Sequence, residues 1–169
     1  LDISPTLAMY EQTNMEFARA YFHWFFLIQR EPLPETLIEA NPEFFIEKMM
    51  GNRHAGLAAF APEALAEYRR CIHLPGIAHA ICEDYRAAAT IDLEHDRADR
   101  DVGRKVMQPL QVLWGENGVI EKCFKPLEDW SRVAVNVRGG SVPCGHYIPE
   151  EAPEALLAAA LPFLLGRSL

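Results

Sequence analysis

The chain has 169 residues, of which half are apolar and 24% are charged, and this composition predicts one soluble globular unit rather than a disordered segment. A formal net charge of −8, with no basic run longer than Arg69-Arg70, argues against nucleic acid or an anionic membrane as a partner. The longest apolar run, Tyr21 to Ile28, is too short to span a bilayer, and no signal-peptide pattern opens the chain. The cysteines show no paired spacing, so we expect reduced thiols in a cytoplasmic protein. They are Cys71, Cys82, Cys123 and Cys144.

Helices dominate the structure expected for the first two thirds of the chain. Apolar residues three, four and seven apart predict one long helix from Thr6 to Ile28, which Pro32 and Pro34 end. Asn41-Pro42 predicts the start of a further helix, because a capping side chain is followed by proline. Glu94 to Lys105 holds eight charged residues out of twelve and is typical of a solvated connector. Other helices are expected over Glu35 to Ala40, Pro62 to Ile72 and Ile77 to about Leu93.

Strand-like and helix-like segments alternate in the last third of the chain. The apolar run Pro109 to Trp114 and the β-branched run Val133 to Val137 predict two strands. Helices are expected after each of them, over Phe124 to Arg132 and Pro153 to Leu165. This alternation indicates a parallel α/β unit. Since two parallel strands do not make a stable sheet alone, and the chain opens without Met, we expect a piece of a longer polypeptide that continues before Leu1.

One histidine has the sequence context of a functional residue. His146 follows the second expected strand and the loop-like Arg138-Gly139-Gly140-Ser141, and it precedes a helix that begins near Pro153. Gly145 beside it permits a sharp turn or a close backbone approach. A loop histidine at the end of a strand can serve as a general base. Taken alone, a lone histidine of this kind is more often a surface-loop residue without a catalytic task.

Short motifs in a fixed order cover nearly the full length of the chain. They are Asp2-Ile3-Ser4-Pro5-Thr6, Tyr21-Phe22-His23-Trp24, Leu33-Pro34-Glu35, Cys82-Glu83-Asp84-Tyr85-Arg86-Ala87, Asp92-Leu93-Glu94-His95-Asp96, Leu113-Trp114-Gly115, and Gly145-His146-Tyr147 with Pro149-Glu150-Glu151-Ala152-Pro153. In this order they resemble the α/β-hydrolase-fold enzymes, and within them the fluoroacetate (haloacetate) dehalogenases. The resemblance implies an α/β fold class: the carboxyl-terminal part of an α/β-hydrolase fold with an all-helical cap. It assigns residues 1–6 to the end of a core strand with the triad acid, residues 7–105 to the helical cap, and residues 106–169 to the last strands and helices of the core.

The resemblance also implies a reaction. In this family an aspartate displaces halide from the α-carbon of the substrate and forms an ester, and a histidine then activates water to hydrolyse that ester. The match makes His146 the base and Asp2 the acid that orients it. Many relatives of the fold carry the acid where this chain has Gly118, so its absence there agrees with Asp2. Taken alone, Asp2 also fits a turn or cap residue before Pro5.

Three cap residues are expected to bind halide and substrate. A fluoride ion that leaves into an apolar pocket needs donors that replace its water. The resemblance assigns this task to His23, Trp24 and Tyr85, whose polar groups sit on largely apolar rings. From the residues alone, Tyr21 to Ile28 also reads as ordinary cap core.

The sequence contains no nucleophile elbow, because neither Gly-x-Asp-x-Gly nor Gly-x-Ser-x-Gly occurs in it. We therefore expect the nucleophile and the arginines that clamp the substrate carboxylate to precede Leu1, and the chain to need the amino-terminal half of the same fold. An ester or epoxide hydrolase of this fold, and a catalytically incomplete fragment that acts as an assembly module, remain alternatives.

Cofactors and metals are not expected. Cys71-x-His73, His79-x-x-Cys82 and Glu94-His95-Asp96 do not have the ligand spacing of zinc sites. The resemblance implies no cofactor, a small haloacid as substrate and a homodimer, without nucleic-acid or membrane partners.

Overall fold

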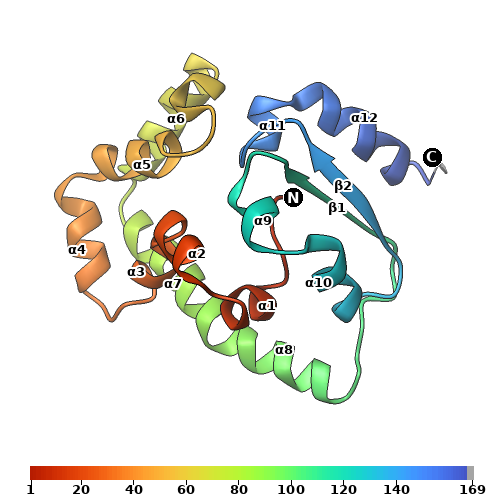
Figure 1. Cartoon of the computed structure of the whole chain (residues 1–169). Helices are drawn as coiled ribbons and strands as arrows, with labels where there is room; N and C mark the ends of the chain where they lie inside the picture. Colours follow the sequence, from red (N-terminus) through yellow and green to blue (C-terminus); the bar gives the residue numbers. More distant parts are fainter. Residues whose placement is uncertain (167–169) are drawn as a thin grey trace.

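A two-stranded parallel sheet with its helices forms one side of the molecule, and helices from the first two thirds of the chain form the other side (Figure 1). The computed structural model describes residues 1–166. β1 (Leu110–Gly115) and β2 (Val137–Val142) pair with Leu110 opposite Val137 and Gly115 opposite Val142. β1 lies close to the predicted Pro109 to Trp114, which confirms that strand.

Helices cover both faces of this small sheet. α12 (Pro153–Leu164) lies on one face, next to the short α11 (Ile148–Glu151). α9 (Val119–Cys123) and α10 (Pro126–Val133) lie on the other. Because helices cover both faces of the sheet, neither face of β1 is open to water, and this explains why its sequence is largely apolar.

The second strand lies further along the chain than predicted. Of the predicted Val133 to Val137, Val133 ends α10, Ala134 forms an isolated bridge with Val106, and only Val137 belongs to a strand. β2 runs through the glycine-rich segment that the sequence predicts as a loop. The physical reason is a close backbone approach. A Cβ added at Gly139 would lie 1.7 Å from the carbonyl oxygen of Val112, so the strands pair there only because residue 139 has no side chain.

The predicted helix from Thr6 to Ile28 is also wrong as a single element. The structure has α1 (Thr6–Glu11), α2 (Met15–Ala20) and α3 (His23–Phe26) instead. Asn14 has extended backbone angles, and its side chain accepts a hydrogen bond from the Phe17 N–H, which starts a new helix within the apolar pattern.

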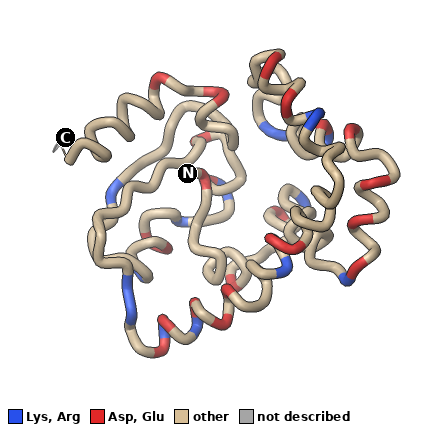
Figure 2. Tube along the Cα trace, turned by 180° about the vertical axis from the view of Figure 1, so that it is seen from behind, with Lys and Arg blue, Asp and Glu red and all other residues tan. Residues whose placement is uncertain are grey.

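The remaining helices follow the sequence signals more closely. Asn41 caps α5 by accepting from the Phe44 N–H, as predicted, and α6 covers the predicted Pro62 to Ile72. The charged segment after Glu94 is not a connector, because most of it forms α8, whose acidic and basic residues alternate along the solvent side (Figure 2). The bounds are α4 (Leu33–Ala40), α5 (Pro42–Gly51), the 3₁₀ helix η1 (Gly56–Ala59), α6 (Pro62–Ile72), α7 (Ile77–Ala89) and α8 (Ile91–Asp101).

The largest buried cluster joins the two sides of the molecule. Phe17 of α2 meets Phe124 after α9 edge to face, with 5.0 Å between the ring centres, and Trp24 of α3 belongs to the same cluster as Trp114 of β1. The helices that follow Asp2 are therefore held against the sheet by aromatic packing. The division into residues 1–6, 7–105 and 106–169 stays a prediction.

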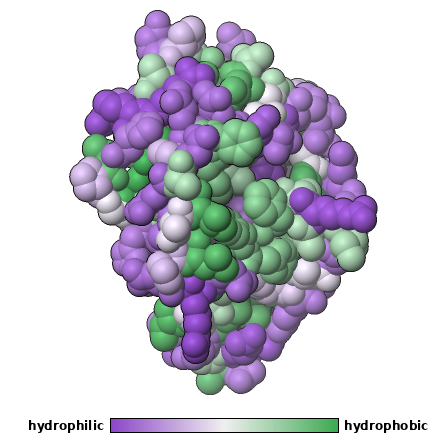
Figure 3. Space-filling model, turned by 90° about the vertical axis from the view of Figure 1, so that its left-hand side faces the viewer, coloured by the Kyte–Doolittle hydropathy of each residue, from purple (hydrophilic) through white to green (hydrophobic). Residues whose placement is uncertain are grey.

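Apolar surface remains on the side of the molecule where α4 and α5 lie (Figure 3). Leu33, Leu37 and Phe44 are among the exposed large apolar residues of these helices. No helix in the described part of the chain is long and apolar enough to cross a membrane. The expected homodimer stays a prediction.

We expect Gly139→Ala to lower the free energy of unfolding by roughly 3 kcal/mol, because the new Cβ collides with the Val112 carbonyl. Gly140→Ala is the matched control, since a Cβ there meets no atom within 4 Å, and it should change that free energy by less than about 1 kcal/mol. Urea unfolding followed by circular dichroism measures both. Equal effects of the two substitutions would contradict the packing of β2 on β1.

Candidate active site

Asp2 and His146, at opposite ends of the chain, meet at the end of β1. Nδ1 of His146 lies 2.5 Å from Oδ2 of Asp2, and Oδ1 of Asp2 accepts from the Gly115 N–H at 2.9 Å. The side chain of Asp2 is 1% exposed, whereas that of His146 is 32% exposed. Because an ionised carboxylate only accepts hydrogen bonds, Nδ1 carries the hydrogen in this pair and Nε2 is left to take a proton.

The segment that carries Asp2 is held in place on both sides. The Asp2 N–H donates to the Leu113 carbonyl at 2.7 Å, the Ser4 hydroxyl donates to the buried Asp129 at 3.0 Å, and the Trp130 indole N–H donates to the Ile3 carbonyl at 2.9 Å. Asp2 has a φ of 49°, a left-handed conformation that aspartate tolerates better than most residues. The surrounding bonds therefore fix a conformation that the chain would not choose alone.

Gly118 lies directly beside the Asp2 carboxylate. A Cβ added at Gly118 would be 3.5 Å and 3.6 Å from the two carboxylate oxygens. Side chains at residues 2 and 118, the two positions considered for the acid, would therefore reach the same space from different segments. With glycine at residue 118, that space is filled by Asp2.

Glu151 ties down the loop that carries His146, and sequence reasoning missed this role. Its carboxylate accepts from the Gly145 N–H at 2.7 Å and from the Tyr147 N–H at 3.0 Å, and it lies 3.3 Å from Nδ1 of His54. Burial alone would raise the pKa of Glu151, but these hydrogen bonds hold it below its ordinary value. The available signal was a glutamate in the first turn after a glycine-flanked loop, where it can reach back to loop N–H groups.

Tyr21 connects His146 to the cap residues and was likewise missed. Its hydroxyl lies 3.1 Å from Nδ1 of His146, and its ring centre lies 5.8 Å from that of His146 and 5.2 Å from that of His23. Burial raises the pKa of Tyr21 far above its usual range, so the phenol stays neutral. Nothing in the sequence separated this tyrosine from the other aromatic residues around it.

The structure brings His23, Trp24 and Tyr85 together. Tyr85 lies with its ring centre 5.6 Å from that of His23 and 6.2 Å from that of Trp24. Burial, followed by the nearby charge of Arg53, lowers the pKa of His23 to about 3, so this imidazole is neutral near pH 7. Its Nδ1 is buried without a hydrogen-bond partner in the described residues. The three rings thus offer neutral polar groups in an apolar setting.

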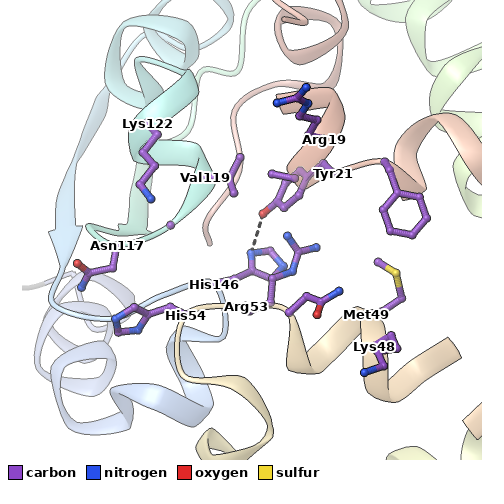
Figure 4. A pocket seen from close by; sticks show the side chains of 14 residues that line it. Arg19, Tyr21, Lys48, Met49, Arg53, His54, Asn117, Val119, Lys122 and His146 are labelled. Atoms are coloured by element: carbon purple, nitrogen blue, oxygen red, sulfur yellow. Dashed lines mark hydrogen bonds between the residues drawn. The ribbon is translucent and has the colours of Figure 1, made fainter. Parts of the chain in front are cut away.

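A cavity of about 460 Å³ lies beside His146, between the helical side and the sheet side (Figure 4). The lining residues include His146, Tyr21 and Gly118, but none of His23, Trp24 and Tyr85. Tyr21 therefore separates the cap residues from the open part of the site. Within residues 1–166, no cluster of three His, Cys, Asp or Glu side chains is placed to hold a metal ion.

Comparison with known proteins agrees with this architecture, although no family model matches the chain. An α/β hydrolase of Nostoc sp PCC 7120, provisionally named as such, superposes with a TM-score of 0.91 at 53% identity over 96% of this chain and 55% of that one. The chain has the carboxyl-terminal part of an α/β-hydrolase fold. The fold class predicted from the sequence is therefore confirmed.

Two curated relatives carry the names of enzymes. The fluoroacetate dehalogenase of Burkholderia sp is 40% identical over 155 residues, which make up 91% of this chain and 50% of that protein. The soluble epoxide hydrolase of Corynebacterium sp. (strain C12) is 35% identical over 105 residues, or 62% of this chain and 34% of that protein. The chain thus spans half or less of the length of the curated relatives that it matches, and it is related to hydrolases of more than one kind.

We expect Glu151→Gln to destabilise the protein by about 1–3 kcal/mol, because the amide group turns an N–H donor toward one of the two loop N–H groups. Hydrogen exchange at Gly145 and Tyr147 should accelerate. Glu150→Gln is the control, since the Glu150 carboxylate accepts from the Tyr68 hydroxyl at an exposed site and from no other group among the described residues.

The same carboxylate predicts a pH effect. A folded-state pKa below the unfolded value of about 4.3 stabilises the fold above that pH, and this stabilisation is lost as the pH falls through the folded pKa. Glu151→Gln should remove this part of the acid sensitivity in urea titrations. Unchanged amide protection in that variant would contradict the role of Glu151.

We expect the acid to be transferable between Asp2 and residue 118. Asp2→Asn should abolish the far-downfield proton resonance of the His146 Nδ1–H, because the carboxylate acceptor is lost. Adding Gly118→Asp should restore the resonance, since that side chain starts beside the same space and Gly118 has a φ of −86°, which any residue adopts. Asp2→Asn with Gly118→Asn is the control. If the resonance persists in Asp2→Asn, the hydrogen bond between His146 and Asp2 is contradicted.

Proposed function

We propose that this chain supplies the base, its orienting acid and the cap of a hydrolase that releases halide from a haloacetate. The observation that carries the proposal is the contact of Asp2 with His146 next to the ring cluster of His23, Trp24 and Tyr85. The identity to the fluoroacetate dehalogenase over 91% of the chain supports the choice of reaction.

The reaction we propose has two steps. An aspartate carboxylate from outside these 169 residues attacks the α-carbon of the haloacetate, forms the C–O bond of an ester and expels halide. His146 then removes a proton from water, the resulting hydroxide attacks the ester carbonyl, and glycolate leaves as the aspartate is regenerated. Asp2 keeps the imidazole in the tautomer that has Nε2 free and stabilises the imidazolium that forms.

We propose that the cap residues stabilise the departing halide. His23 is neutral, and its Nδ1 has no hydrogen-bond partner within residues 1–166, so this imidazole is available to donate a hydrogen bond to an anion. The indole N–H of Trp24 and the hydroxyl of Tyr85 supply further donors on apolar rings. Donors placed where negative charge develops lower the barrier because they replace hydration at no cost of reorganisation.

An epoxide or ester hydrolase is the second candidate. It is favoured by the 35% identity to the soluble epoxide hydrolase, which covers 62% of this chain. The same base would hydrolyse an ester formed by epoxide opening, and a serine in place of the aspartate would give an esterase. Product analysis with haloacetate, epoxide and ester substrates separates these reactions.

The proposal predicts fluoride release from fluoroacetate by the polypeptide that joins this chain to the segment with the nucleophile. His23→Ala and Trp24→Phe should each lower kcat/KM for this release by about 10-fold or more, because each removes one donor to the leaving halide. His95→Ala, at an exposed position on α8, is the matched control and should leave the rate unchanged. Full activity in both His23→Ala and Trp24→Phe would reject the halide site.

A second readout tests the base independently of the halide site. His146→Asn should form the ester but fail to hydrolyse it, so the protein should gain the mass of the acetate group in stoichiometric amount. Release of halide in many turnovers by His146→Asn would reject the proposed base.

A further inference from the structure

The cavity beside His146 has a charge opposite to that of the chain. The chain carries 24 acidic and 16 basic residues, whereas the cavity lining includes basic side chains and no aspartate or glutamate. These basic side chains are Arg19, Lys48, Arg53 and Lys122. They come from α2, from α5 and the loop after it, and from α9, so both sides of the molecule contribute (Figure 4). A cleft lined by one sign of charge concentrates ions of the opposite sign.

Arg53 has no carboxylate partner within residues 1–166, unlike six other arginines of this part of the chain. Its guanidinium stacks over the ring of Tyr21, 4.2 Å from the ring centre, and it forms no ion pair with a carboxylate among residues 1–166. Its Nε is buried without a hydrogen-bond partner in the same residues. By contrast, Arg69, Arg70, Arg86, Arg100, Arg104 and Arg132 each lie within 4 Å of an acidic side chain. A stacked, unpaired guanidinium keeps donors available for an anion.

Arg53 also lies next to the catalytic pair. Tyr21, on which it stacks, hydrogen-bonds to His146, and both Arg53 and His146 line the cavity (Figure 4). An anion bound by Arg53 would therefore share its space with the atom that activates water. The planar fork of a guanidinium matches the two oxygens of a carboxylate, and the cavity of about 460 Å³ has room for a small carboxylic acid.

We propose that Arg53 is a substrate-binding residue that holds the carboxylate of a small acid from the cap side, while the other cationic side chains attract anions to the cavity. This inference rests on the proposed function, because it names the group by which that substrate is held. It adds a contact from the cap to the arginines that the resemblance places beside the nucleophile. Carboxylate binding at Arg53 does not itself require that a halide is released.

The test is a titration with acetate of the ¹⁵N-labelled polypeptide that joins this chain to the segment with the nucleophile, at constant ionic strength. Acetamide serves as the neutral molecule of the same shape. Acetate should shift the amide resonances of Arg53, Gly118 and His146 to saturation, and acetamide should not. Arg53→Gln should weaken acetate binding by about 10-fold, since a charge-assisted hydrogen bond is lost. Arg97→Gln, which removes an exposed charge on α8, should leave acetate binding unchanged.

Arg53→Lys provides a second variant if Arg53→Gln does not fold. It keeps the charge and the alkyl chain but loses the fork, so acetate binding should weaken by a few-fold. Acetate affinity that is unchanged in either folded variant overturns the proposal. Equal displacement of acetate by chloride would show an adventitious ion only. Acetate carries no halogen, so its binding does not depend on the proposed reaction. Saturable acetate binding without fluoride release by the same polypeptide would reject the dehalogenation and leave carboxylate binding at Arg53 supported.

Discussion

The short contact between Nδ1 of His146 and the carboxylate of Asp2 is the interaction on which the site depends. It joins residues that are 144 positions apart, so the helical side and the sheet side must pack correctly before it forms. A buried carboxylate is stable only when its oxygens find donors, and here His146 and the Gly115 N–H supply them. The geometry of the base is thus a consequence of satisfying one buried charge.

Around that contact the structure places residues whose effect on chemistry is indirect. Glu151 fixes the peptide groups on both sides of His146, and Gly118 leaves room for the Asp2 carboxylate. Tyr21 touches the imidazole, the neutral His23 and the guanidinium of Arg53. A single neutral phenol therefore lies between the imidazole of His146, the ring of His23 and the guanidinium of Arg53.

The sequence predicted the fold class and the partners Asp2 and His146, because motif order carries that information along the whole chain. It failed where local patterns have two physical solutions. Gly139 and Gly140 read as a loop, but a missing side chain also lets two strands approach closely. The apolar periodicity from Thr6 to Ile28 predicted one helix and hid the capping role of Asn14, whose side chain starts a new helix. Arg53 and Glu151 could not be found, since their roles depend on neighbours far away in the sequence.

The bond between His54 and Glu151 has a mechanical consequence. His54 follows α5 on the helical side, and Glu151 belongs to α11, the short helix after His146. The carboxylate of Glu151 therefore contacts both the loop that carries His146 and a residue of the helical side. If the helices swing away to admit a ligand, that carboxylate loses a partner at the same moment. Opening of the helical side would therefore also loosen the loop that carries His146, because both depend on the same carboxylate.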